Sequence, residues 1–134
     1  MHRINLTSAW NCFSVSNGRE VWARWFGCPT NVSPLEQVLL VAEPQVQMRL
    51  WLNEQSLVEA APALAGVAIT DRLCHRNLLV VPPPGTRAPQ AKAWAAAIRE
   101  GSLVATQANF PSAWGMISLV IAEEVVDFGA VANR

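Results

Sequence analysis

The side chains with the clearest chemical potential are tryptophan, arginine and glutamine residues on two predicted strands. Gln47, Arg49 and Trp51 alternate with aliphatic residues and therefore share one strand face. Trp22 and Arg24 share a face in an earlier strand. An aromatic ring can stack on the apolar face of a sugar while planar polar groups bind its hydroxyls. These residues are therefore the candidate ligand-binding set for a carbohydrate, and burial in a core or interface is the alternative for both tryptophans.

No catalytic centre emerges from the residue pattern. Glycoside hydrolysis needs two carboxylates facing each other across a cleft, and the sequence singles out no such pair among the ten acidic residues. Cys74 and His75 are chain neighbours, which sends their side chains apart on an extended chain. His2 and His75 are too few for a metal cluster. We therefore expect no enzyme activity, metal-ligand set or cofactor, while a structural calcium held by backbone carbonyls stays open.

Length and composition limit the number of domains and the classes of partner. The 134 residues predict a single domain, and charged residues make up only 15% of them, below the roughly 25% typical of soluble domains. The formal net charge is zero and no long basic run occurs, so neither nucleic acid nor a membrane surface is an expected partner. The odd number of cysteines argues against a disulfide framework. The polar start shows no signal peptide, which predicts a cytoplasmic protein.

Most of the elements that would position these side chains are short strands. Strands are expected at 20–26, 37–43, 46–53, 77–81 and 114–121, with a weaker one at 103–106. Asn53 and Glu54 are expected to turn the chain at the end of 46–53, so that this strand forms a hairpin with residues 56–58. Such a series of short strands predicts a two-sheet sandwich or barrel.

One segment predicts a helix instead. Residues 89–100 are rich in alanine, with a proline near the start and Gly101 just past the end. Trp94 and Ile98 lie four residues apart and should dock together onto the sheet. The other tryptophans, Trp10, Trp25 and Trp114, are expected in the core.

Four polar residues are expected to support the scaffold. Asn53 suits the left-handed corner of a hairpin. Thr70 and Asp71 can satisfy free N–H groups at the start of a short turn. Asn77 can bond the loop backbone before the chain enters its strand.

Several stretches, in order, resemble the sugar-binding domain at the N-terminus of family 2 glycoside hydrolases. Arg24–Thr30 is similar to the family's arginine–aromatic strand that ends at a proline. Val46–Leu57 resembles its Leu-Asn-Gly hairpin pattern, and Val67–Val81 resembles its "Phe-Asp-Ile-Thr, Arg-x-Asn, strand" signature. Trp114–Ile121 is similar to the closing strand. The resemblance implies an antiparallel jelly-roll β-sandwich of the galactose-binding-domain type, with its core at 10–122, a helical insertion at 88–101 and a tail at 123–134.

Two positions depart from the family pattern, since Glu54 replaces a glycine and Ala68 replaces an aspartate. Family 2 enzymes carry their catalytic carboxylates on a separate barrel, so the resemblance does not imply hydrolysis. Two functions stay open. The first is a non-catalytic carbohydrate-binding module. The second is a structural or self-associating interaction domain that has lost sugar binding, which the low charge and the missing signal peptide favour.

Overall fold

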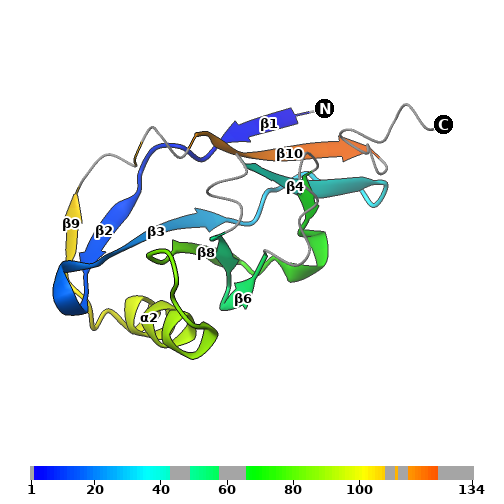
Figure 1. Cartoon of the computed structure of the whole chain (residues 1–134). Coiled ribbons are helices and arrows are strands. Elements are labelled where there is room, and N and C mark those ends of the chain that lie inside the picture. Colours follow the sequence, from blue (N-terminus) through cyan, green and yellow to red (C-terminus); the bar gives the residue numbers. More distant parts are fainter. Residues whose placement is uncertain (1, 43–48, 58–65, 108–110, 112–114, 124–134) are drawn as a thin grey trace.

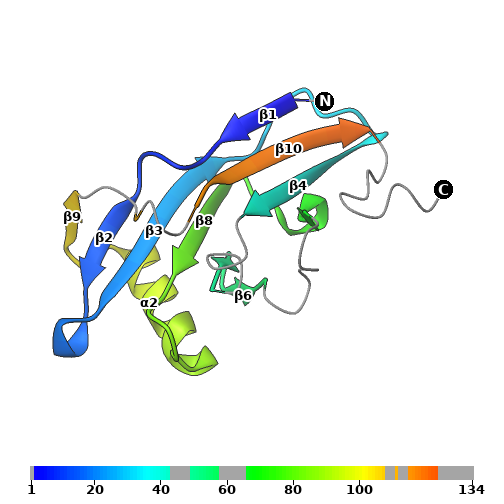
Figure 2. The ribbon, with the colours of Figure 1, turned by 45° about the horizontal axis from the view of Figure 1, so that its top comes forward.

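Two antiparallel sheets stack face to face in the computed structural model, which describes residues 2–42, 49–57, 66–107, 111 and 115–123 (Figures 1 and 2). The four-stranded sheet has the order β1 (His2–Asn5), β10 (Ile117–Glu123), β4 (Glu36–Ala42), β7 (Val67–Ala68). The six-stranded sheet has the order β6 (Gln55–Ser56), β5 (Trp51–Leu52), β8 (Arg76–Val81), β3 (Glu20–Gly27), β2 (Asn11–Ser14), β9 (Ala105–Gln107). This arrangement confirms the predicted all-β sandwich.

The inner faces of the two sheets form the main core. Alternate residues of β4 and β10 point inward, including Leu40 and Leu119, and meet the inward residues of the other sheet, such as Leu79. Leu50 and Leu52 also lie in this core, as the alternation in their segment predicts. Successive residues of β4, β8 and β10 are apolar because side chains on both faces of these strands are buried, including the outward Leu39, Val80 and Val120.

Helix α2 (Ala88–Glu100) lies on the outer side of the six-stranded sheet, away from β1, β10 and β4 (Figure 1). Its buried side carries Trp94 and Ile98, which contact outward residues of β3 and β8 such as Val21 and Val80. Gly101 ends the helix with φ +79°, and its N–H bonds the carbonyl of Ile98. The predicted helix, its docking residues and its glycine stop are confirmed.

The predicted hairpin is also confirmed. Strands β5 and β6 pair with Leu52 opposite Gln55, so Asn53 and Glu54 form a two-residue turn. Their φ angles of 48° and 69° are both positive, which is the geometry that hairpin twist favours. Glu54 therefore takes the left-handed conformation that a glycine would occupy more easily.

The sandwich extends beyond the predicted core of 10–122. Strand β1 pairs with β10 from His2 to Asn5, and β10 continues to Glu123. The predictions for Gln47 and Trp114, and for the tail from 124 onward, concern residues outside the described part of the chain. Within the described part of the chain, no helix is long and apolar enough to cross a membrane.

Candidate functional site

The two tryptophans predicted to bind a sugar do not come together. Trp22 is 6% exposed and belongs to the core between the sheets, whereas Trp51 is half-buried on the opposite face, against the α2 cluster. Both lie in the six-stranded sheet, so one sheet separates their rings. Arg49 lies in a turn just before Trp51. A single sugar therefore cannot contact both tryptophans.

The Arg24 side chain, on the inner side of β3, donates hydrogen bonds to two backbone carbonyls. Its Nε donates to the carbonyl of Ser8 at 2.6 Å, and its Nη1 donates to the carbonyl of Trp25 at 2.9 Å. Burial lowers the pKa of the Arg24 guanidinium below its ordinary value. These two hydrogen bonds account for the position of the Arg24 guanidinium without a bound ligand.

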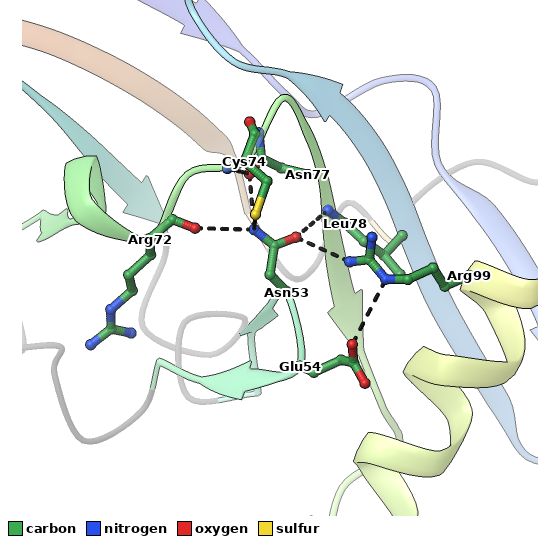
Figure 3. A network of polar contacts seen from close by, with 7 residues as sticks. All are labelled: Asn53, Glu54, Arg72, Cys74, Asn77, Leu78 and Arg99. Carbon is green, nitrogen blue, oxygen red and sulfur yellow. Dashed lines mark hydrogen bonds and ion pairs between the residues drawn. The ribbon is translucent and has the colours of Figure 1, made fainter.

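Asn53 and Asn77, by contrast, meet at the centre of a polar network (Figure 3). The Asn53 amide nitrogen donates to Asn77 Oδ1 at 2.9 Å and to the carbonyl of Arg72 at 3.2 Å. Asn53 Oδ1 accepts from the backbone N–H of Leu78 at 2.9 Å and from Arg99 Nη2 at 3.2 Å. The hairpin turn is thereby joined to the start of β8 and to the end of α2.

Asn77 is fully buried and organises the loop that precedes its strand. Its Oδ1 accepts the backbone N–H of Cys74 at 2.7 Å, and its Nδ2 donates to the carbonyls of Cys74 and Phe26 at 3.0 and 3.4 Å. Both polar atoms of this side chain therefore have hydrogen-bond partners, as is usual for buried polar groups.

The predicted capping role of Thr70 and Asp71 is wrong. Neither side chain caps the short 3₁₀ turn η3 (Thr70–Arg72). Thr70 Oγ1 instead accepts the backbone N–H of Val38 at 2.9 Å, and the N–H of Ile69 donates to the carbonyl of Val38 at the same distance. Strand β7 ends at Ala68, so the hydroxyl replaces the carbonyl that a longer strand would have offered to β4.

Trp25 was expected in the core, and this prediction is wrong. It is half-buried on the outer face of β3, where the guanidinium of Arg76 lies 4.2 Å and that of Arg99 lies 5.2 Å from the ring centroid. Arg99 also approaches Glu54, with Nε 3.8 Å from the carboxylate. The ring thus contacts two cations while it also packs against the edge of the hydrophobic cluster beneath α2.

A cavity of about 520 Å³ opens at the end of the sandwich where β3 stops. Its lining comes from β1, β3, β4, β10 and the connection from β3 to β4: His2, Ile4, Gly27, Cys28, Pro29, Thr30, Asn31, Glu36 and Ile121. Glu36 Oε1 accepts the backbone N–H of Ser33 at 2.9 Å, which fixes this carboxylate at the cavity wall. The cavity therefore combines a fixed carboxylate with the aliphatic surface of Ile4 and Ile121, which both belong to the four-stranded sheet.

The cysteines differ in reactivity. Cys12 is buried, and this burial, with a contribution from the Glu20 carboxylate, raises the pKa of its thiol from 9.0 to about 11. Cys28 and Cys74 are exposed. No group of three or more histidine, cysteine or acidic residues suited to a metal ion occurs among the described residues.

This difference predicts a labelling pattern. At neutral pH, a thiol reagent such as iodoacetamide should modify Cys28 and Cys74 in the native protein and Cys12 only after unfolding, because the thiolate is the reactive form. Peptide mass spectrometry measures the labelled fraction at each site. Equal labelling of all three thiols in the native protein would contradict the burial of Cys12.

No protein-family model matches the chain, and comparisons with the curated proteins and with the solved structures find no match either.

Proposed function

We propose that this chain is a non-catalytic carbohydrate-binding module and that its site is the cavity at the end of the sandwich. The observation that carries the proposal is the composition of that cavity. Its volume of about 520 Å³ lies within the roughly 300–1,000 Å³ of ordinary ligand sites. Ile4 and Ile121 offer aliphatic surface to the C–H face of a sugar ring. Thr30, Asn31 and Glu36 offer hydrogen-bonding groups to its hydroxyls.

Charge favours a neutral sugar over an acidic one. Among the described lining residues, Glu36 is the one acidic side chain and His2 the one basic side chain, and no lysine or arginine accompanies them. A uronic acid would place its carboxylate near Glu36 without a guanidinium to compensate, and like charges repel. The preferred ligands are therefore neutral hexosides.

The sequence resemblance supports the same proposal. Family 2 sugar-binding domains are jelly-roll sandwiches, and the stretches that resemble them include the hairpin at Asn53 and the strand that begins near Asn77. In this chain those asparagines contact each other and serve the scaffold. The proposal therefore assigns sugar contact to the cavity and not to the residues that carry the resemblance.

Replacing Asn31 by glycine should weaken saccharide binding about three- to tenfold, which is the loss expected for one hydrogen bond. Asn31 has φ +60°, a conformation that glycine adopts without strain, so the substitution removes the amide and leaves the turn intact. The measurement is an NMR titration of the labelled protein with galactosides, glucosides and glucuronides, followed at backbone amides.

Asn17→Gly is the matched control. Asn17 has φ +62° and lies in the turn η1 (Ser16–Gly18), which precedes β3, whereas the cavity lies where β3 ends. This control should bind saccharides like the unmodified protein. Equal affinities for the two variants would remove Asn31 from the site. Absence of any saccharide-dependent shift at the cavity would contradict the proposed function.

A further inference from the structure

Two guanidinium groups gather over one indole ring on the outer face of the six-stranded sheet. Arg76 and Arg99 lie 4.2 and 5.2 Å from the centroid of Trp25. We call Trp25, Arg76 and Arg99 the arginine–tryptophan surface. A ring covered by guanidinium groups has little face left for a sugar, so this surface differs in chemistry from the cavity.

Arg76 is the more available of the two cations. It is exposed, and within the described part of the chain no carboxylate lies within ion-pair distance of it. Stacking on Trp25 holds the guanidinium plane in place while the N–H groups along its edge stay accessible. A fork held in this way matches the two oxygens of a carboxylate.

Arg99 already shows how a carboxylate approaches this surface. Glu54 lies 3.8 Å from its Nε, and both side chains are more than a third exposed. An exposed pair at this distance is weak. A carboxylate from outside can therefore compete with Glu54 for Arg99 while a second carboxylate binds Arg76.

We propose that the arginine–tryptophan surface binds an acidic segment of a partner protein through its glutamate or aspartate carboxylates. The chain has zero net charge and no long basic run, so it lacks the extended charge that a nucleic-acid backbone requires. Two guanidinium groups held over one ring suit two carboxylates of a short peptide instead. This inference does not depend on the sugar site.

The first test uses hexaglutamate peptide as the probe in an NMR titration at low ionic strength. The peptide should shift the indole N–H signal of Trp25. Arg76→Ala should weaken binding about fivefold or more, because it removes both the charge and the fork. Arg76→Lys keeps the charge and loses the fork, so it should recover only part of the affinity.

Two further substitutions should change the affinity in opposite directions while leaving both arginines in place. Gly27 lies opposite Arg76 in the ladder of β3 and β8, and a Cβ added there meets no atom within 4 Å. Gly27→Glu should place a competing carboxylate beside Arg76 and weaken peptide binding, whereas the matched variant Gly27→Gln should not. Glu54→Gln removes the carboxylate next to Arg99 and should strengthen binding.

Other results would overturn the proposal. Binding that is unchanged by Arg76→Ala and by Gly27→Glu would show that the peptide binds elsewhere. Failure of the native chain to bind hexaglutamate at low ionic strength would exclude an acidic segment as the partner. Tighter, Arg76-dependent binding of a short oligothymidylate would assign the surface to nucleic acid and reject the protein partner.

Discussion

Replacing Trp94 by alanine is expected to lower the free energy of unfolding by about 3–5 kcal/mol, the range measured for large aromatic residues removed from cores. Trp94 is only 8% exposed and joins α2 to outward residues of the sheet, among them Phe13 and Leu78. The remaining buried side of the helix consists of Ile98 and small alanines, which cannot close over the space an indole leaves. Urea denaturation followed by circular dichroism measures the loss.

Lys92→Ala is the control in the same helix. Lys92 is exposed, and alanine is a good helix former, so this variant should differ from the native protein by less than about 0.5 kcal/mol. Hydrogen exchange should also accelerate selectively in α2 of the Trp94→Ala protein, because docking and not helix propensity holds so short a helix. A Trp94→Ala loss below about 1 kcal/mol would show that α2 is held by other contacts.

The features that sequence predicts well are those set by local chemistry. The helix at Ala88–Glu100 follows from its alanines, proline and terminal glycine, and the hairpin follows from an asparagine that tolerates positive φ. Strand β1 was missed because His2–Asn5 is short and mostly exposed. Its pairing with β10 depends on a partner more than a hundred residues away, which no local pattern reveals.

The candidate site was harder to predict because it depends on how strands face one another. Alternation places Trp22 and Arg24 on one side of β3, and Trp51 on one side of β5, but it does not relate those sides between strands. The pairings of both strands with β8 put Trp51 on the outer side and Trp22 on the inner side. The cavity at Asn31 likewise arises where separate elements meet, so only the fold could show it.

Replacing Asn77 by alanine is expected to lower the free energy of unfolding by about 3 kcal/mol. The side chain is fully buried, and its removal leaves the N–H and the carbonyl of Cys74 without this partner. Each buried polar group left unsatisfied costs about 1–3 kcal/mol. Asn5→Ala is the matched control, because Asn5 is exposed and its side chain accepts the N–H of Thr7. The loss in this variant should stay below about 1 kcal/mol.

The contact between Asn77 and Asn53 makes the same prediction testable as a coupling. Asn53 Nδ2 donates to Asn77 Oδ1, so each single alanine variant already breaks this bond and the double variant cannot break it again. The sum of the two single losses in the free energy of unfolding should therefore exceed the loss in the double variant by about 1 kcal/mol or more. Strict additivity would mean that the hairpin turn and the entry to β8 are stabilised separately. In that case the network in Figure 3 would not join them energetically.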